Sequence, residues 1–401
     1  MTDHTFDLFT RRFKADPFPA FAQMRTDAPV YAHLAPDGST IWYITRYEDV
    51  TAVLRDDIHF CKDPRHARPA EKPRNSLMAR LINENMLFSD PPDHTRLRAL
   101  VNQAFTPRRV EGLAGAIRET AVSLLNTLST KSEIELIADY ALPLPVRIIS
   151  ELLGIPQKDR EEVSDWSQAI VSPGSKGLTY SARRRKVKAF VAYLQEMFAD
   201  RAVHPQDDLV TALVQAEEAG EKLNEQELSS MVALLLVTGH ETTVNLIGNG
   251  VFSLLQHPQQ LACLLAGEVD WATAVEELLR YDGPVETSTT RWVREDVLLH
   301  GQQLRRGDVV RAVITSANHD AAQFDRADTL DVARTDNKHL AFGMGIHYCL
   351  GAPLARLEGR IALPLLFEHF PHLRLAVPPQ ELRWRSGVLF RGLAALPLAL
   401  R

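Results

Sequence analysis

The sequence predicts a mainly α-helical protein of the α+β class, with one large helical part and smaller β-sheets. From position 96 to about position 277, apolar residues recur at helical spacing, and glycine and proline interrupt them at GIP, SPG and HPQ. Stretches rich in β-branched and aromatic residues, which favour strands, lie outside this region at 39–47, 297–315 and 385–390. Helices and strands that are separated along the chain in this way are typical of the α+β class.

A chain of 401 residues has room for roughly two or three domains by length alone. However, the sequence contains no internal repeat, no low-complexity segment and no long run of Gly, Ser or Pro of the kind that forms linkers. We therefore expect a single domain over 1–401. The segments 62–76 and 171–185 are candidates for mobile lids, with ordinary surface loops as the alternative.

The composition is that of a soluble globular protein, with 45% hydrophobic and 24% charged residues. A net charge of -6 without a long basic run gives no electrostatic footprint for nucleic acid. Residues 1–18 lack the apolar core of a signal peptide, and the longest strongly apolar run, MVALLLV, is far shorter than the ~20 residues that span a bilayer. We expect a cytoplasmic protein that binds neither nucleic acid nor membrane. The basic stretch SARRRKVKAF is either a solvated helix face or a source of positive charge for an acidic substrate.

The three cysteines, Cys61, Cys263 and Cys349, are far apart and have no CxxC spacing, which argues against a disulfide framework or a structural zinc site. Cys263 lies in an apolar helical pattern and is expected to be a small core residue. Cys61 carries no functional signal. Cys349 differs from both because it lies among glycines, two residues after His347.

Cys349 precedes or begins a helical pattern, so the positive end of a helix dipole favours its thiolate form. The neighbouring glycines allow backbone N–H groups to approach the sulfur closely. Three interpretations follow: a metal-ligating thiolate, a buried structural cysteine, or a nucleophile activated by His347. No residue near His347 in the sequence is an obvious partner to orient it, which makes the nucleophile the weakest of the three.

Residues 342–351 read FGMGIHYCLG. This pattern, FGxGxHxCxG, resembles the haem-binding signature of the cytochrome P450 family. Four other stretches resemble motifs of that family in the same order. They are DPPDHTRLRALVNQAF for an early haem-facing helix, VTGHETTVN for the oxygen-binding groove of a long central helix, EELLRY for the ExxR motif, and TTRWVRED for the strand after it.

The resemblance implies the cytochrome P450 fold in one domain, with heme b (iron protoporphyrin IX) between a central helix at about 224–256 and the cysteine loop 342–351. It implies that Cys349 is the axial ligand of the haem iron. Haem propionates need charge-assisted partners, for which arginine and histidine are suited. The cofactor-binding residues implied are His94, Arg98, Arg291, His347, Phe342, Gly343, Cys349 and Gly351. Arg96 lies on another helix face from His94 and Arg98, and we expect it to be an exposed charge.

Glu277 and Arg280 are three residues apart and share a helix face. In isolation such a pair is usually a weak surface ion pair. The resemblance implies that both join Arg334 in a buried structural network that braces the cysteine loop.

Glu241 and Thr242 lie in the middle of an apolar helical stretch. Burying a carboxylate and a hydroxyl is unfavourable unless they have partners, so a functional groove is inferred here. The alternative is a helix N-cap, which the continuation of the apolar pattern on both sides disfavours. The resemblance implies that Gly239 and Thr242 make room for dioxygen and water and that Glu241 relays protons. Thr238 replaces the family's usual alanine, and its hydroxyl bonds either a substrate or water, or the backbone one turn earlier.

The resemblance implies a haem-thiolate monooxygenase that inserts one oxygen atom of O2 into a C–H bond or C=C of a mostly hydrophobic small molecule, in secondary metabolism. The alternative is a haem protein that senses or carries a ligand without turnover. The family topology implies a pocket lined by apolar residues and a few hydroxyls, consistent with such a molecule. Its members are Met86, Leu234, Val237, Thr238, Thr287 and Leu389.

No strand followed by GxGxxG occurs, so electrons must come from separate proteins. We expect a ferredoxin and a ferredoxin reductase as partners, and a monomer. Positive charge on the thiolate side of the haem would attract an acidic partner. The residues expected to supply it are Arg108, Arg109, Lys338 and Arg356.

Overall fold

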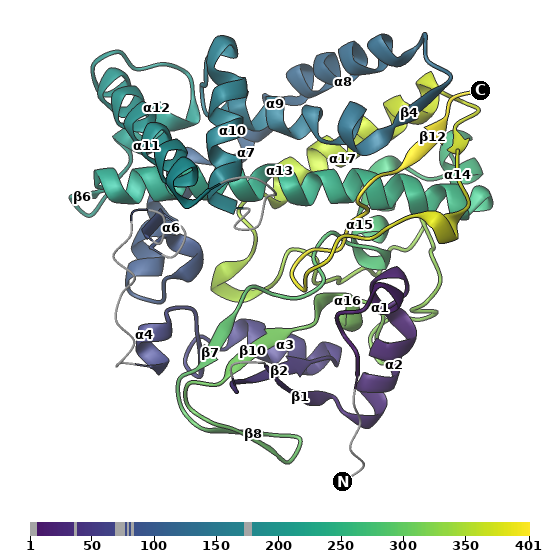
Figure 1. Ribbon diagram of the computed structural model, residues 1–401, viewed down its shortest axis with the longest axis horizontal. Coiled ribbons are helices and arrows are strands. Elements are labelled where there is room, and N and C mark those ends of the chain that lie inside the picture. Colours follow the sequence, from purple (N-terminus) through teal and green to yellow (C-terminus); the bar gives the residue numbers. More distant parts are fainter. Residues whose placement is uncertain (1–5, 36–37, 69–76, 78–79, 82–83, 172–178) are drawn as a thin grey trace. The chain divides into compact units, whose positions relative to one another are not determined.

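The computed structural model describes residues 6–35, 38–68, 77, 80–81, 84–171 and 179–401 (Figure 1). The chain forms two compact units. One contains Met1–Glu71, Ala121–Ala141 and Thr242–Arg401, and the other contains Lys72–Thr120 and Leu142–Glu241. The α+β class predicted from the sequence is confirmed, since long helices and short strands occupy largely separate parts of the chain.

The second unit is almost entirely helical. It contains η1 (Met86–Phe88), α6 (Asp93–Ala104), α7 (Pro107–Glu111), α9 (Pro143–Leu152), η3 (Gln157–Asp159), α10 (Arg160–Val171), α11 (Tyr180–Val203) and α12 (Leu209–Gln215). Polar side chains cap these helices: Thr179 accepts a hydrogen bond from the Ala182 N–H, and Asp208 from the Thr211 N–H. α10 and α11 pack side by side (Figure 1). The hairpin of β5 (Glu217–Glu218) and β6 (Glu221–Lys222) follows α12.

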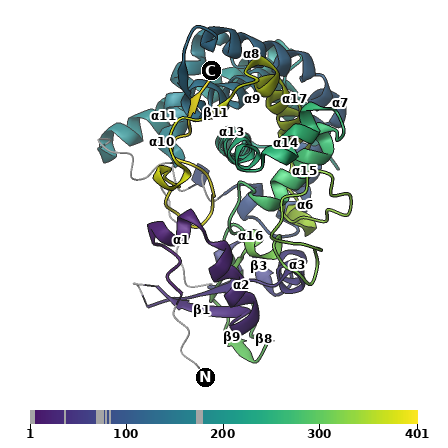
Figure 2. The same ribbon diagram turned by 90° about the vertical axis from the view of Figure 1, so that its right-hand side faces the viewer.

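The helix α13 (Glu225–Gln256) corresponds to the central helix expected at about 224–256. Its 32 residues give a length of about 48 Å, and Figure 2 views it nearly end-on. By length and composition it could cross a membrane, but 61% of its most apolar window is buried inside the protein. That burial is typical of the core helix of a globular protein.

The helices of the first unit include two that bear on the site, α15 (Trp271–Tyr281) and α17 (Ala352–His369), which pack against each other. Asp270 caps α15 by accepting a hydrogen bond from the Thr273 N–H. The others are α1 (Arg11–Ala15), α2 (Phe18–Asp27), α3 (Tyr47–Arg55), α4 (Pro64–Ala67), α14 (Pro258–Leu265), α16 (Ile314–Ala317), η2 (Ile137–Ala141), η4 (Gly345–His347) and η5 (Pro379–Glu381). The helix α8 (Ala114–Leu128) begins in the second unit and ends in the first.

The largest sheet has five strands in the order β1 (Val30–Leu34), β2 (Thr40–Ile44), β10 (Val309–Ala312), β7 (Arg291–Val293) and β3 (Phe60–Cys61). The β2–β10 pairing is parallel and the others are antiparallel. Apolar side chains of these strands and of α3 form a buried core. A second sheet has the order β11 (Arg374–Leu375), β12 (Pro397–Ala399) and β4 (Glu133–Glu135), and β8 (Val297–Leu299) forms a hairpin with β9 (Gln302–Leu304).

Two local predictions are wrong. The stretch 385–390 forms only an isolated bridge between Val285 and Phe390, because Gly387 has a positive φ of 121° that interrupts an extended strand. Cys263 is half-buried on α14 and is not a core residue. For the predicted lids, 69–76 and 172–178 lie outside the described residues, and the remaining parts include α4 and the start of α11.

Candidate active site

The cysteine loop is a tight turn that presents Cys349 at the surface of the first unit. The Cys349 N–H donates to the Phe342 carbonyl at 3.0 Å, and the Tyr348 N–H donates to the Gly345 carbonyl at 3.0 Å. The Cys349 side chain is exposed. The sulfur is therefore not packed into the core of the first unit.

Two glycines of this loop have conformations that other residues adopt only with strain. Gly343 has a φ of 68° and Gly345 a φ of 75°. A Cβ atom at Gly345 would lie 2.7 Å from the Leu54 carbonyl oxygen at the end of α3. Position 345 therefore needs glycine for two reasons, the positive φ and the close approach of the Leu54 carbonyl. At position 343 only the positive φ favours glycine, because a Cβ atom there would meet nothing within 4 Å.

The helix α17 begins three residues after Cys349, with Gly351 as its N-cap. A helix N-terminus carries partial positive charge, which favours the thiolate form of a nearby cysteine. A Cβ atom at Gly351 would lie 3.9 Å from the Cys349 Sγ atom, so the glycine keeps that side of the sulfur open. This local geometry suits a sulfur that binds a metal.

Glu277 and Arg280, the ExxR pair of α15, are fully buried in a network with Arg334. Arg280 forms two hydrogen bonds of 2.8 Å with the two Glu277 carboxylate oxygens, and Arg334 Nε lies 3.1 Å from Glu277 Oε2. Asn337 Nδ2 and the Asp331 N–H also donate to Glu277, at 3.1 and 2.9 Å. Arg280 donates to three further carbonyls, those of Asn318, Ala327 and Thr329. The structure thus brings together all three residues predicted for the structural network.

The basic residues predicted to bind propionates lie in both units. In the first unit, Arg291 on β7 is 2% exposed and donates to the carbonyls of Phe60 and Leu54, at 3.3 and 3.2 Å. His347 is half-buried in η4. In the second unit, His94 is buried and Arg98 half-buried, one turn apart on α6.

Arg96, which was expected to be an exposed charge, is half-buried and forms ion pairs with Glu227 and Glu221. The prediction is wrong because the β5–β6 hairpin and the start of α13 bring carboxylates to this face of α6. Such contacts depend on tertiary structure and have no signal in the local sequence.

The middle of α13 contains several half-buried residues, and five of them form one stripe. Its members recur at i, i+3, i+4, i+7 and i+8, which places them on one helix face. They are Leu234, Val237, Thr238, Glu241 and Thr242. The neighbouring residues Leu236 and Val244 are buried. The stripe contains both predicted catalytic residues and three of the predicted substrate residues.

Thr238 and Gly239 have packing explanations within α13 and its neighbour. The Thr238 hydroxyl donates to the Leu234 carbonyl at 2.7 Å, so it bonds the backbone one turn earlier, one of the two alternatives for this residue. A Cβ atom at Gly239 would lie 3.2 Å from Ile149 Cδ1 of α9. The glycine therefore permits a close approach of α9 to α13.

The other predicted substrate residues are distributed over both units. Met86 is buried in η1 of the second unit. In the first unit, Thr287 is buried and its hydroxyl donates to the Val388 carbonyl at 2.8 Å, while Leu389 is half-buried.

The basic residues expected on the thiolate side differ in how far their charge is neutralised. Arg108 is exposed. Arg109 and Lys338 form loose ion pairs of 3.5 Å with Asp207 and Asp336. Arg356 forms a two-point ion pair with Glu276, at 2.7 Å for both hydrogen bonds. Sequence reasoning missed Glu276 as a site residue, because its partners His339 and Arg356 lie 63 and 80 positions away and no local pattern marks them.

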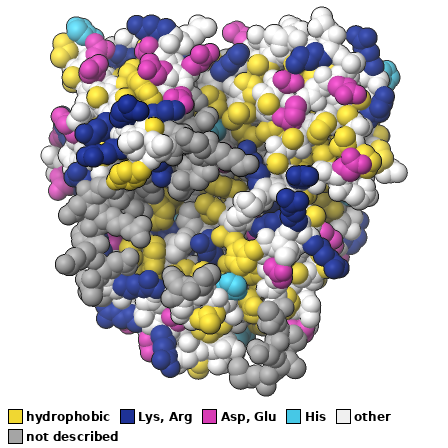
Figure 3. All heavy atoms as spheres, viewed as in Figure 1, with side chains coloured by type: hydrophobic (Ala, Val, Ile, Leu, Met, Phe, Trp, Pro, Cys, Tyr) yellow, Lys and Arg dark blue, Asp and Glu magenta, His cyan; other side chains and the backbone are white. Residues whose placement is uncertain are grey.

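The basic stretch of α11 projects into solvent. Arg184, Arg185 and Lys188 are exposed, and Lys186 forms an ion pair of 2.6 Å with Asp165. Figure 3 shows Lys and Arg side chains gathered over this part of the second unit. These positions match the solvated helix face that was one of the two alternatives for this stretch.

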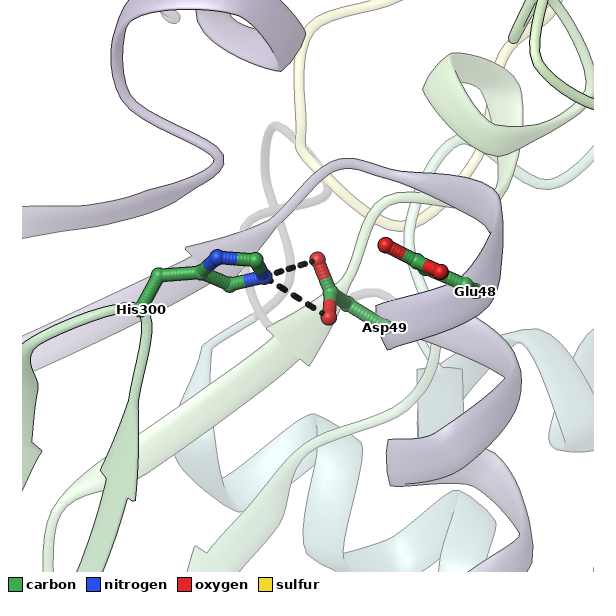
Figure 4. Close-up of side chains that lie close together, drawn as sticks. All are labelled: Glu48, Asp49 and His300. Atoms are coloured by element: carbon green, nitrogen blue, oxygen red, sulfur yellow. Dashed lines mark hydrogen bonds and ion pairs between the residues drawn. The ribbon is translucent and has the colours of Figure 1, made fainter.

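Within the described residues, one group of three side chains has the spacing of a metal site: Glu48, Asp49 and His300 (Figure 4). His300 Nε2 lies 3.0 and 2.8 Å from the two Asp49 carboxylate oxygens. This ion pair between α3 and the β8–β9 turn accounts for the cluster without a metal, and Glu48 is exposed.

Comparisons with known proteins agree with this site. A family model described as Cytochrome P450 matches residues 272–391. The polyketide biosynthesis cytochrome P450 PksS of Bacillus subtilis is 42% identical to this chain over 398 residues, which is 97% of each chain. A solved structure of PksS aligns with a TM-score of 0.91 at 41% identity and covers 99% of this chain and 100% of that one. The cytochrome P450 monooxygenase PikC of Streptomyces venezuelae is 42% identical over 97% of this chain and 92% of PikC. A structure of P450BioI in complex with hexadec-9Z-enoic acid ligated acyl carrier protein aligns with a TM-score of 0.87 at 36% identity, covering 98% of this chain and 99% of that one.

The fold, the cysteine loop and this similarity over nearly the whole chain define a haem-dependent oxygenase. The chain belongs to the cytochrome P450 family. It is a monooxygenase that uses O2, takes electrons from redox partners and acts on a hydrophobic small molecule. The prediction of a monooxygenase is confirmed.

The described residues fit a haem. The Cys349 sulfur lies exposed before a helix N-terminus, as an iron-ligating thiolate requires. Arg291 is almost completely buried as a charged group, and its guanidinium supplies the donors that a propionate needs. The strained glycines keep side chains away from the loop that carries the sulfur.

Proposed function

We propose that this cytochrome P450 hydroxylates or epoxidises a polyketide-derived or fatty-acyl molecule in the cytoplasm. The Cys349 thiolate would bind the iron of a heme b, and Glu241 and Thr242 would be the catalytic proton-relay residues. The observation that carries the proposal is the half-buried stripe of α13, because it exposes a carboxylate and a hydroxyl side by side in an apolar helix. The bound haem supplies the activation of dioxygen.

The chain's own residues hold and move protons beside the haem. In this proposal the Thr242 hydroxyl would hold a proton on the haem-facing side of α13, and the Glu241 carboxyl group would pass protons from water to that hydroxyl. The Cys349 thiolate would hold the haem iron and would supply electron density to it. Leu234 and Val237, on the same helix face, exclude water and contact the substrate.

Two sets of residues hold the haem, and a third set supports the loop that carries the sulfur. His94, Arg98, Arg291 and His347 bind the propionates, and Phe342, Gly343 and Gly351 form the loop around the sulfur. Glu277, Arg280 and Arg334 keep that loop in place, which the fully buried network around Glu277 supports. The haem lies between α13 and the cysteine loop in a single functional domain.

The substrate class follows from the pocket residues and from the relatives. Met86, Leu234, Val237 and Leu389 are apolar, and Thr238 and Thr287 use hydroxyls to bond carbonyls of the chain, so the pocket selects by shape and apolar area. PksS is named for polyketide biosynthesis, and P450BioI was solved with a fatty acid carried on acyl carrier protein. These names support an elongated apolar substrate.

The electron donors are a ferredoxin and a ferredoxin reductase, and the enzyme acts as a monomer. The chain carries no GxGxxG fingerprint for a flavin or nicotinamide in the required context. Exposed Arg108, with Arg109 and Lys338 in only loose ion pairs, supports docking of an acidic partner.

The experiment compares the purified haem-loaded enzyme with the matched variants Thr242→Val and Thr243→Val. Thr243 is buried beside the stripe and does not belong to it. A library of polyketides and fatty acyl compounds is first screened for displacement of the iron-bound water, read as a spin-state shift in the visible spectrum. With the best substrate, product formed per O2 consumed is expected to fall about tenfold or more in Thr242→Val and to stay near wild type in Thr243→Val. Equal coupling in both variants would contradict the proton-relay role.

A further inference from the structure

Arg356 and Glu276 form an ion pair that connects α17 with α15. Arg356 Nε and Nη2 each donate to a different Glu276 carboxylate oxygen at 2.7 Å. This two-point geometry fixes the plane of the guanidinium group more strongly than a single hydrogen bond would. Both side chains are about one-third exposed, so the pair lies at the edge of the protein interior.

The guanidinium group of Arg356 lies over the cysteine loop. Its Cζ atom is 4.4 Å from the centre of the Phe342 ring, within the range of a cation–π contact. Its Nη1 atom donates to the Tyr348 hydroxyl at 3.1 Å. Phe342 accepts the Cys349 N–H at its carbonyl, and Tyr348 directly precedes Cys349. Arg356 thus contacts both sides of the turn that presents the sulfur.

Glu276 also binds His339, three residues before the cysteine loop. His339 Nε2 lies 3.1 Å from Glu276 Oε2, and His339 Nδ1 accepts a hydrogen bond from the Ala341 N–H at 3.2 Å. Because Nδ1 accepts, the proton of the neutral ring lies on Nε2, which donates to Glu276. The carboxylate therefore connects the segment before the loop, through His339, with the helix after it, through Arg356.

We propose that Glu276 and Arg356 are positioning residues whose opposite charges set the reduction potential of the haem through Phe342 and the cysteine loop. The proposal rests on the proposed role of Cys349 as axial ligand. Reduction of the iron adds one negative charge to the haem, so a nearby cation favours the reduced state and a nearby anion opposes it. In the native pair the two charges largely cancel.

The test is the reduction potential of the substrate-free haem-loaded enzyme, measured by spectroelectrochemistry in two single variants and one double variant. Arg356→Gln removes the cation and leaves the Glu276 carboxylate, so the potential is expected to fall. Glu276→Gln leaves an uncancelled cation over Phe342, so the potential is expected to rise. The double variant Glu276→Gln/Arg356→Gln has neither charge and is expected to lie between the two, near wild type.

Opposite signs distinguish an electrostatic role from mechanical support. If the pair only braces the loop, both single variants loosen it and shift the potential in the same direction, and that result would overturn the proposal. Arg356→Lys keeps the charge and is expected to stay closer to wild type than Arg356→Gln. A matched control is Arg326→Gln, which removes the same charge from an exposed ion pair with Asp331 and is expected to leave the potential unchanged.

The thiolate band of the ferrous–CO complex separates failure of this proposal from failure of the proposed function. If the wild-type enzyme lacks the red-shifted thiolate-type band, Cys349 is not the iron ligand. That result would contradict both the proposed function and the role of the Glu276–Arg356 pair. If the wild-type enzyme has that band and both single variants shift the potential in the same direction, only the proposed role of the Glu276–Arg356 pair is contradicted. Potentials are compared among variants that retain the band, and Arg356→Met, which also removes the cation, replaces Arg356→Gln where that variant loses the band.

Discussion

Glu276 and Glu277 are adjacent in the sequence, yet their carboxylates bind different parts of the chain. Glu277 is fully buried and holds Arg280, Arg334 and Asn337, whereas Glu276 is partly exposed and holds Arg356 and His339. Successive residues on a helix point about 100° apart, so a pair of neighbouring acids can serve two networks. One network stabilises the segment before the cysteine loop, and the other contacts the loop itself.

Glu277→Gln is expected to lower the free energy of unfolding by about 3–5 kcal/mol, because it leaves the guanidinium groups of Arg280 and Arg334 without their carboxylate in a buried site. Urea unfolding followed by circular dichroism measures this change. The matched control is Lys186→Gln, which breaks the exposed pair with Asp165 and is expected to change stability by less than about 0.5 kcal/mol. Equal losses in the two variants would show that burial does not matter here.

The pH dependence of stability is expected to change in Glu276→Gln. Burial raises the pKa of Glu276, but hydrogen bonds from Arg356 and His339 outweigh burial and lower the pKa to about 2, from an ordinary value of 4.5. A carboxyl group whose pKa is lowered on folding stabilises the folded state above its unfolded pKa and loses that contribution as pH falls toward the folded one. The free energy of unfolding of wild type should therefore fall between about pH 4.5 and about pH 2, and less steeply in Glu276→Gln.

Glu358 provides a control of opposite sign for that pH profile. Burial raises the pKa of Glu358 well above its ordinary value. Its stabilising contribution is then complete below the unfolded pKa and is lost as pH rises. Glu358→Gln should therefore alter the slope above about pH 4.5, where Glu276→Gln should not. Identical pH profiles for the two variants would disprove both assignments.

Thr238→Ala and Thr238→Val are expected to leave substrate affinity, coupling and product pattern unchanged within about twofold, since the hydroxyl donates to the Leu234 carbonyl of its own helix. The measurements are a spin-state titration and product analysis by mass spectrometry. Val keeps the shape of Thr without its hydroxyl, so a loss confined to Ala reflects volume. A tenfold loss of affinity in both variants would assign the hydroxyl to the substrate.

Gly345→Ala is expected to reduce haem content and to destabilise the protein by more than about 1–2 kcal/mol. The new Cβ atom adds a clash with the Leu54 carbonyl to the strain of a positive φ. Gly343→Ala, with a similar φ but open space around the Cβ position, should show the dihedral strain alone. Haem absorbance per protein and thermal unfolding are the readouts. If Gly343→Ala is as damaging as Gly345→Ala, contact with α3 is irrelevant.

Features that depend on neighbouring residues could be predicted from the sequence. The apolar stretch around Glu241 and Thr242 indicated a helix, and the resemblance placed a central helix at about 224–256, which spans Glu225–Gln256. The position of Cys349 just before α17 follows from the glycines and the helical pattern around it. The spacing of Glu277 and Arg280 likewise gives one helix face.

Features that depend on contacts between distant residues could not be predicted. Glu276 binds partners 63 and 80 positions away, His339 and Arg356, and no local pattern marks such pairs. Arg96 was expected to be exposed for the same reason, since its carboxylate partners belong to other elements. At 385–390 the β-branched and aromatic composition favoured a strand, but the positive φ of Gly387 breaks the extended backbone there.

The carbonyl of Leu54 accepts a hydrogen bond from Arg291 and lies where a Cβ atom at position 345 would clash. One backbone oxygen therefore restricts two distant positions, one on a sheet and one in a loop. This constraint does not depend on which side chain stands at position 54, because it resides in the main chain. A one-residue insertion or deletion in α3 is different, since it would displace that oxygen from both of its neighbours in a single step.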